Sequence, residues 1–356
     1  MVSPAVLVRR AREAAALRRE QLAAWARLDL ARLKDLEEGR AEFTWRELDR
    51  CARVFGLRVD DLLEGEAGRA PMTLLLRSHQ SESSLEAQEN LTVDSCELLG
   101  EFQRALRDIA ELEQELCISR PAFPTIRKGT KKAELHPGES LARTVRRELG
   151  LGDDAIPSMV ELLQTLGLYV LWESKIERTL DGACARLPVP GVLVVLDEDF
   201  PSPWRTRTTL AHELCHLLFD LGADRPVLLS PSHARGRHMD DLERTAKAFA
   251  AHLLVPSSGV KLLVGSKEPT SEDAIGAVGA TFGVGRQLVI NRLQQVFGFS
   301  EEQRDRMEKR TAARYRADFT RDEPPERSGL RGEPLFGLVH QALKQGRIPP
   351  SRARHI

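Results

Sequence analysis

Hydrophobic residues recur at helical spacing through most of the chain, and only one region contains short runs typical of β-strands. Near the N-terminus, several short amphipathic segments follow one another, and Gly39 and Gly56 stand where helices are expected to end. Residues 64–71, which include two glycines and a proline, are typical of a linker. The pattern therefore predicts an all-α domain over residues 1–68.

A leucine-rich helical pattern then runs through residues 93–116. It predicts one long connecting helix, packed on a neighbour, within a helical linker over residues 69–136. Beyond residue 300 the composition turns polar and rich in arginine. There we expect a partly disordered tail over residues 301–356, with one more helix over residues 334–350.

Residues 137–300 combine both kinds of pattern and predict an α+β domain with a small β-sheet. Short strands are expected at 169–174, 182–188 and 191–197. Helices are expected at 140–151, 158–168, 206–222, 240–256 and 278–299. The fold class predicted for the whole chain is therefore multidomain and mainly α.

Composition and charge narrow the classes of function. The chain of 356 residues is 42% hydrophobic and 29% charged, with a formal net charge of −1, which is typical of a soluble globular protein. Any contact with nucleic acid must come from a local basic patch. No apolar stretch is long enough for a signal peptide or a membrane span, and the five cysteines are scattered without a CxxC pair. We expect a cytoplasmic protein that does not associate with membranes.

The predicted helix over residues 206–222 contains the pattern His212-Glu213-x-x-His216. Histidines at positions i and i+4 lie on one face of a helix, so both imidazoles can reach one zinc ion. Glu213 would lie beside the open coordination position and act as general base. The alternative is a helix that contains two histidines by coincidence. Apolar flanks predict that this helix is buried, and buried histidine and glutamate side chains need a partner, which favours zinc.

A third protein ligand is expected downstream. Six residues could supply it: His233, His238, Asp240, Asp241, Glu243 and His252. Glu243 is favoured because it opens a helical segment whose face continues through Ala246 and Ala250, small residues that allow close helix packing. A glutamate in the first turn of a helix can instead be there because it interacts favourably with the helix dipole. The other five residues therefore remain candidates for the third ligand.

Two stretches, RTRTTLAHELCHLLF and LERTAKAFAAHLLVP, resemble motifs of the ImmA/IrrE family of zinc metallopeptidases, and the resemblance extends over about residues 140–300. It implies a zincin-like metallopeptidase domain over residues 137–300 that binds one Zn²⁺ per chain. The zinc ligands would be His212, His216 and Glu243, and Glu213 would be the general base. The family also implies limited cleavage of a specific protein, often a helix-turn-helix repressor.

The chain departs from this family pattern at two positions. Cys215 stands where the family usually has glycine, and Lys247 where it has asparagine. In related zinc peptidases with a glutamate ligand, the position of Lys247 often holds a polar partner of a ligand histidine. A lysine cannot accept the imidazole N–H, so a site that binds metal but turns over poorly is the alternative to a fully active one.

Residues 18–40 have the rhythm of two helices joined by a tight turn, and with their flanks they resemble the XRE/Cro-type helix-turn-helix. This resemblance implies that the second helix enters the major groove of DNA. The residues expected at the DNA are Ala31, Arg32, Lys34 and Asp35 near the bases, with Arg19 and Gln21 nearer phosphate. A homodimer is the usual assembly of such a module.

Other features suit a different role for this N-terminal domain. The turn normally contains a glycine, and this chain offers Arg27 or Leu28 there. The segment is only mildly basic, which also fits a five-helix module for dimerisation or partner docking. Trp25 and Trp45 are predicted to be core aromatics rather than base-stacking groups.

The sequence as a whole predicts a regulatory zinc endopeptidase that cleaves a transcriptional repressor and binds DNA. The alternative is a DNA-binding regulator or antitoxin-like protein whose peptidase fold is a non-catalytic sensor or scaffold. For the peptidase, a hairpin over residues 182–197 is expected to offer an edge strand that aligns an extended substrate.

Overall fold

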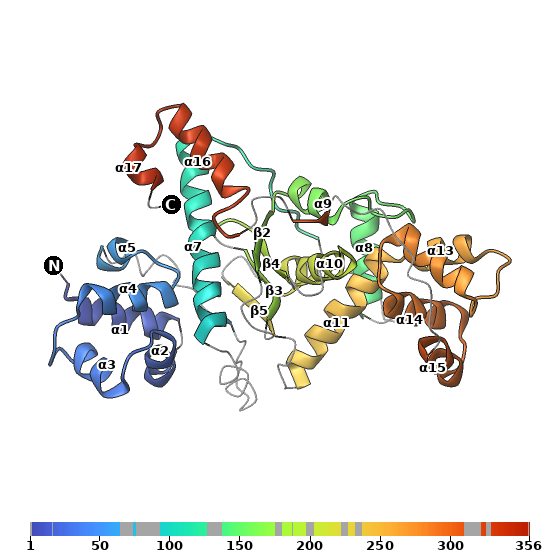
Figure 1. Cartoon of the computed structure of the whole chain (residues 1–356), viewed down its shortest axis with the longest axis horizontal. Helices are drawn as coiled ribbons and strands as arrows, with labels where there is room; N and C mark the ends of the chain where they lie inside the picture. The colour runs from blue at the N-terminus through green and yellow to red at the C-terminus, as the bar shows by residue number, and fades with distance from the viewer. Residues whose placement is uncertain are drawn as a thin grey trace.

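Figure 1 shows a computed structural model of the chain, with a bundle of N-terminal helices, one upright helix, and a sheet flanked by further helices. The structure describes residues 2–15, 17–64, 74–75, 93–126, 137–174, 180–186, 188–196, 203–221, 227–231, 237–309, 322–324, 329–354 and 356. It confirms a multidomain, mainly α chain with one small sheet. Within these ranges, none of the helices is long and apolar enough to cross a membrane.

The N-terminal bundle consists of α1 (Pro4–Ala14), α2 (Arg19–Trp25), α3 (Leu30–Glu37), α4 (Trp45–Val54) and α5 (Val59–Leu63). Capping side chains fix two of the helix starts. Asp29 accepts a hydrogen bond from the backbone N–H of Arg32, and Thr44 and Glu47 form a capping box at α4. Trp25 is buried as predicted. The prediction for Trp45 was wrong, because this residue begins α4 outside the core and is 61% exposed.

The turn between α2 and α3 contains no glycine, and Arg27 adopts the conformation that glycine favours. Its φ of 52° lies in the left-handed region, which is strained for a residue with a side chain. The Arg27 guanidinium also pairs with Asp94 at 2.7 Å and Glu97 at 3.0 Å on helix α7 (Val93–Glu115). The arginine that replaces the usual glycine therefore ties the bundle to α7.

Replacing Arg27 by glycine should give a more stable chain than replacing it by alanine. Both variants lose the ion pairs to α7, so their difference reflects the strain of alanine at a positive φ less the entropy that glycine adds to the unfolded chain, a net of up to about 1 kcal/mol in favour of glycine. Chemical denaturation of the two variants measures this difference. An alanine variant as stable as the glycine variant would show that this turn is not strained.

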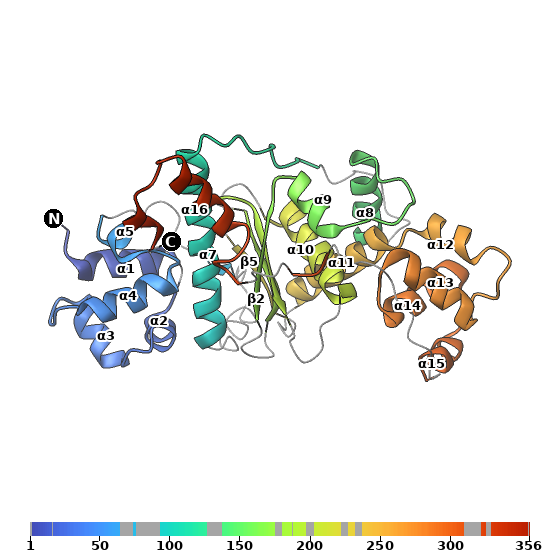
Figure 2. The same ribbon diagram turned by 45° about the horizontal axis from the view of Figure 1, so that its top comes forward.

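Helix α7 connects the bundle to the sheet. Gly100 allows a close approach to the bundle, because a Cβ at this position would lie 2.0 Å from the carbonyl oxygen of Arg53. Arg58, which precedes α5, forms an ion pair with Asp108 and lies 3.3 Å from Glu111. The bundle, α7 and one face of the sheet share a single hydrophobic core, and Figure 2 shows α7 between the other two.

The sheet has five strands in the order β1-β5-β3-β4-β2. Their bounds are β1 (Leu74–Leu75), β2 (Tyr169–Ser174), β3 (Leu180–Ala185), β4 (Gly191–Leu196) and β5 (Val227–Pro231). Strand β3 pairs antiparallel with β4 and β5, whereas β2 pairs parallel with β4 and β1 pairs parallel with β5. The predicted strands β2, β3 and β4 are confirmed, and β1 and β5 were not predicted.

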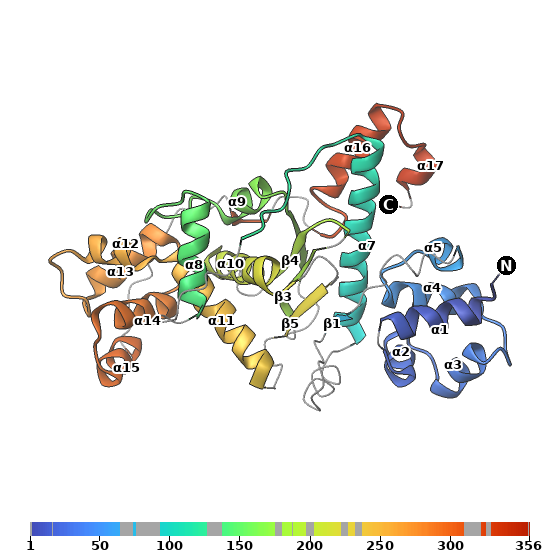
Figure 3. The ribbon, with the colours of Figure 1, turned by 180° about the vertical axis from the view of Figure 1, so that it is seen from behind.

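Alternate residues of β3 and β4 face different layers of the molecule. Ala183 and Leu193 lie in the core shared with α7, whereas Cys184, Val192 and Val194 pack with helix α10 (Pro203–Phe219). Figure 3 shows α7 and α10 on opposite sides of the sheet. Because both faces are covered, β4 is apolar along nearly its whole length.

The expectation of an edge strand in the 182–197 hairpin was wrong. Strands β3 and β4 each have a neighbour on both sides, because β5 pairs with β3 from Ala183 opposite Leu229 to Ala185 opposite Val227. The backbone groups along this register are already used by the protein's own sheet. This hairpin therefore offers no free edge, and the edge strands of the sheet are β1 and β2.

The second hydrophobic core lies among the helices beyond the sheet. Those helices are α8 (Pro137–Glu148), α9 (Met159–Thr165), α10, α11 (Arg237–Leu254), α12 (Ser257–Val264), α13 (Glu272–Phe282), α14 (Arg286–Phe297) and α15 (Glu301–Lys309). Gly283, with a φ of 63°, separates α13 from α14 within the stretch predicted as helical. Helices α16 (Leu335–Lys344) and α17 (Pro350–Ala353) lie near the C-terminus, where α16 packs on α7.

Asp322, from the C-terminal region, is buried against the second core. Asp322 forms an ion pair with Arg207 of α10, and both side chains are fully buried. Asp322 also accepts hydrogen bonds from the Ser158 hydroxyl at 2.9 Å and the Val160 N–H at 3.0 Å. The sequence around Asp322 predicts disorder, whereas the structure places this carboxylate at the centre of a buried polar network.

Candidate metal centre

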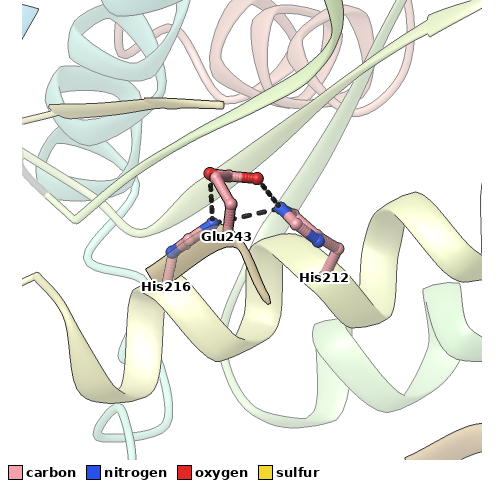
Figure 4. A group of neighbouring side chains, drawn as sticks. All are labelled: His212, His216 and Glu243. Carbon is pink, nitrogen blue, oxygen red and sulfur yellow. Dashed lines mark hydrogen bonds and ion pairs between the residues drawn. The ribbon is translucent and has the colours of Figure 1, made fainter. Parts of the chain in front are cut away.

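Helix α10 presents His212 and His216 from successive turns, with both imidazoles directed to the same side (Figure 4). Leu210, Ala211 and Leu214 are fully buried around them and hold this helix in the second core. The His216 side chain is completely buried, and the His212 side chain keeps 11% of its exposure. The apolar flanks thus place two polar rings inside the protein, open to solvent only at His212.

Glu243 reaches the two histidines from α11. The neighbouring positions Ala246 and Ala250 are fully buried, and their small side chains allow α11 to pack closely on α10. Glu243 Oε2 lies 3.1 Å from His212 Nε2, and Glu243 Oε1 lies 3.3 Å from His216 Nε2. The two Nε2 atoms are 3.1 Å apart.

These separations suit a zinc ion. In a tetrahedral site with zinc–ligand distances of about 2.0–2.1 Å, neighbouring donor atoms lie about 3.3 Å apart. In the part of the chain that the structure describes, His212, His216 and Glu243 are the group able to hold a metal ion. Two imidazoles and a carboxylate are also the donor set of hydrolytic zinc sites, which leave one position for water.

Asp220 orients one of these histidines. Its Oδ2 lies 2.8 Å from His216 Nδ1, so that Nε2 points to Glu243, as a zinc-binding histidine requires. Burial lowers the pKa of His216, but hydrogen bonds to Asp220 and Glu243 outweigh it and raise the pKa to about 10. A metal ion would displace this proton at neutral pH, so metal affinity should increase as the pH rises.

Glu213 lies on α10 against strand β3 and is almost completely buried. Gly182 of β3 lets the sheet approach α10 closely, because a Cβ there would lie 2.6 Å from Thr209 Cγ2; it would lie in ordinary contact, at 3.6 Å, with Glu213 Oε1. The Cys184 thiol donates a hydrogen bond to the Glu213 carboxylate. The hairpin therefore positions the carboxylate, although it offers no edge to a substrate.

One oxygen of Glu213 is left without a partner. Its Oε2 is buried and forms no hydrogen bond within the described ranges. Burial raises the pKa of Glu213, while the two histidines act to lower it. An unpaired buried carboxylate oxygen is costly, and such atoms are commonly satisfied by a water molecule or ligand in the adjoining site. The charges of His212, His216 and Glu243 act on this carboxylate, so it lies near the three donor residues.

Two family models match this chain. Residues 164–294 match the peptidase M78 family model, described as the IrrE N-terminal-like domain, and residues 5–64 match a helix-turn-helix domain. The chain joins a helix-turn-helix domain to an IrrE N-terminal-like domain. Both family resemblances seen in the sequence are confirmed. A search of curated proteins found no match.

The other candidate ligands of the IrrE-like domain do not join this group. Asp241 is exposed and pairs with a neighbouring arginine, and His252 contacts a buried arginine of α14. His238 and Asp240 belong to α11, but their side chains are not among those described. His233 lies outside the described residues.

Lys247 and Cys215, the two departures from the family pattern, lie in different surroundings. Lys247 is exposed on α11 and forms no hydrogen bond to a ligand histidine in the described part of the chain. The residue that orients His216 is Asp220, four residues later on the same helix. This role of Asp220 was not predicted from the sequence. Cys215 is buried in the second core.

Helix α3 carries four of the residues expected at DNA. Ala31 and Lys34 are exposed, and Lys34 forms no ion pair with any described residue. Arg32 is held by Glu47 at 2.9 Å, and Asp35 pairs with an arginine at 2.7 Å. Lys34 is therefore the cation of α3 that is most available to another molecule.

Helix α2 carries the two residues expected near phosphate. Arg19 pairs with the buried Glu37 at 2.8 Å. Gln21 is buried and accepts a hydrogen bond of 2.8 Å from the backbone N–H of Arg18, which caps the helix. Both side chains thus also contribute to the stability of the bundle.

Proposed function

We propose that the IrrE-like domain is a zinc-dependent endopeptidase that makes a limited cut in a specific protein. The observation that carries this proposal is the unpaired, buried Oε2 of Glu213 beside three donor atoms at zinc spacing. A purely structural trio of side chains would not need a carboxylate with an unsatisfied oxygen next to it. Limited cleavage of a helix-turn-helix repressor is supported by the resemblance to ImmA/IrrE proteins.

In amide hydrolysis, each of these residues would have a separate role. His212, His216 and Glu243 would hold the zinc, which when bound supplies a Lewis acid for water and for the scissile carbonyl. Glu213 Oε2 would take the proton of the attacking water and pass it to the leaving nitrogen. Cys184 and Gly182 would keep the Glu213 carboxylate in place, and Asp220 would keep His216 Nε2 directed at the site.

Zinc binding can be tested separately from activity. We expect about one zinc per chain in the purified protein, and loss of stoichiometric zinc in His216→Ala. Asp220→Asn should retain the site with about 10–100-fold weaker affinity, because an uncharged amide oxygen replaces the carboxylate that accepts the Nδ1–H of a ligand imidazole. The measurement is competitive titration with a zinc chelator.

Asp241→Asn is the matched control for this experiment, because Asp241 is an exposed acid at the start of α11 that lies outside the donor group. Its zinc affinity should equal that of the wild type. A wild-type chain that binds no zinc at stoichiometric level would leave the alternative, a non-catalytic peptidase fold that serves as a sensor or scaffold.

We also propose that the helix-turn-helix domain binds DNA through α3. Lys34→Glu should weaken binding to the operator and flatten its salt dependence, since one phosphate-neutralising charge is reversed. Electrophoretic or anisotropy measurements at several salt concentrations test this. Lys267→Glu, a charge reversal on the IrrE-like domain, is the control and should leave DNA binding unchanged.

A further inference from the structure

A groove opens beside His212, along the N-terminal half of α10 and across to α14. Its volume is about 1250 Å³, and its lining comes from α8, α10, α11, α12 and α14. Seven lysine and arginine side chains line it, against a single carboxylate, that of Glu139. Because His212 is part of the lining, the groove is continuous with the candidate metal centre.

Three of these cations have acidic partners. Arg143 pairs with Glu139 at 2.8 Å, Arg286 pairs with a glutamate at 2.6 Å, and Arg244 pairs with an aspartate at 3.0 Å. Two other cations of the groove, Lys247 and Lys261, are exposed and form no ion pair in the described part of the chain. The groove therefore carries an excess of positive charge at these two lysines.

The two lysines come from different helices. Lys247 stands one helical turn after Glu243 on α11, and Lys261 lies on α12. Lys261 also lines a second hollow of about 790 Å³, together with Arg146 and Arg147 of α8. The positive surface therefore begins near the metal centre and continues past α12.

The floor of the groove contains a buried cation. Arg292 is 1% exposed, and it donates hydrogen bonds to the Val255 carbonyl at 3.0 Å and to the Ser257 hydroxyl at 2.9 Å, with His252 Nε2 at 3.1 Å. Burial lowers the pKa of Arg292 to about 10, so the guanidinium remains charged at neutral pH. These three groups are uncharged acceptors, and the carboxylate that acts on Arg292 is that of Glu139 on the groove wall.

We propose that this groove binds an acidic segment of the protein substrate, with Lys247 and Lys261 as the residues that recognise its carboxylates. Complementary charge selects partners and speeds their association. The exposed ring of Trp204 and the side chains of Leu288 and Val296 also line the groove, which suits a peptide with apolar and acidic residues. The groove also offers a surface for an extended peptide, which the hairpin does not, because β3 and β4 have no free edge.

This inference rests on the proposed peptidase function, and it assigns the substrate class of that same site. It also gives Lys247 a role. Where the family has asparagine, this chain places a cation on the groove wall. Substrate choice by this protein would then differ from that of relatives without a lysine at this position.

A binding measurement tests the proposal without turnover. The full-length Glu213→Gln protein is titrated into two fluorescein-labelled peptides of identical length, which differ only in having glutamate or glutamine at the same positions. We expect tighter binding of the glutamate peptide, with an affinity that falls as salt is added. In the Lys247→Glu/Lys261→Glu background its binding should weaken by about tenfold or more, while the glutamine peptide is unaffected.

The matched control is Lys267→Glu/Lys309→Glu, which makes the same charge change at exposed positions outside the groove. It should bind both peptides as the unaltered background does. Equal affinities for the two peptides, or equal weakening by the control, would overturn the proposal. So would a single-stranded DNA oligonucleotide that binds through Lys247 and Lys261 when the glutamate peptide does not.

The two proposals fail in different ways. A protein that binds the glutamate peptide through these lysines but holds no zinc would retain the groove assignment and lose the peptidase function. A protein that holds zinc and cleaves a substrate, with no preference for the glutamate peptide, would retain the peptidase function and lose the groove assignment.

Discussion

Replacement of Glu213 by glutamine should lower the rate of substrate cleavage by about 10²–10⁴-fold, because an amide cannot accept the proton of the attacking water. Zinc should remain bound, since His212, His216 and Glu243 are untouched. The side chain keeps its size, and its burial against Gly182 and Cys184 is preserved. The experiment compares the rate constants for cleavage of one substrate by the two zinc-loaded proteins.

Glu302→Gln is the control for this substitution, because Glu302 is exposed on α15 and lies away from the donor group. Its rate should equal that of the wild type. A Glu213→Gln protein that cleaves as fast as the wild type would remove Glu213 from the reaction and with it the proposed mechanism.

Breaking the buried pair of Arg207 and Asp322 should destabilise the chain by about 3–5 kcal/mol, because Asp322→Ala leaves the guanidinium charged, buried and without its carboxylate. The double variant Arg207→Met/Asp322→Leu should lose much less stability, since neither charge then remains. Urea denaturation of the three proteins measures the unfolding free energies.

The exposed pair of Arg147 and Glu148 provides the comparison. Glu148→Ala should change the unfolding free energy by less than about 0.5 kcal/mol, because both side chains are largely in solvent. An equally small effect of Asp322→Ala would mean that the C-terminal region does not hold α10 in place. A large effect would link this region to the helix that carries His212 and His216.

The parts of the fold that the sequence predicts are those encoded by local apolar spacing. The helix of His212 and His216, the helix of Glu243 and the strands β2, β3 and β4 all follow from such patterns. Ala246 and Ala250 led to the prediction that Glu243 packs on the histidines, because their small side chains allow the two helices to come close together. The site could therefore be proposed before its geometry was known.

The remaining features depend on contacts between distant segments. Asp322 lies in a polar, proline-rich stretch, and its partners Arg207 and Ser158 are more than a hundred residues away in sequence. Strand β5 is only five residues long, and it pairs with β3 of the hairpin that was expected to offer an edge strand. Neither feature has a periodic signal, because each depends on tertiary partners.

The roles of Asp220 and Lys247 depend on the residues that surround them in the fold. Asp220 could have been found, since an acid four residues after a ligand histidine shares its helical face. From the resemblance to the family motif, Lys247 was considered as a residue that could weaken zinc binding. Its exposure on the wall of a cationic groove makes it a candidate for substrate selection instead.

We propose that Glu213, together with a bound zinc ion, cleaves one specific protein. The most direct measurement is a comparison of new protein N-termini, by mass spectrometry, in cells that express the wild-type chain or the Glu213→Gln chain at equal levels. We expect one or a few new N-termini that appear only with the wild type, in a protein with an acidic stretch near the cut. Identical sets of N-termini in the two strains would contradict it.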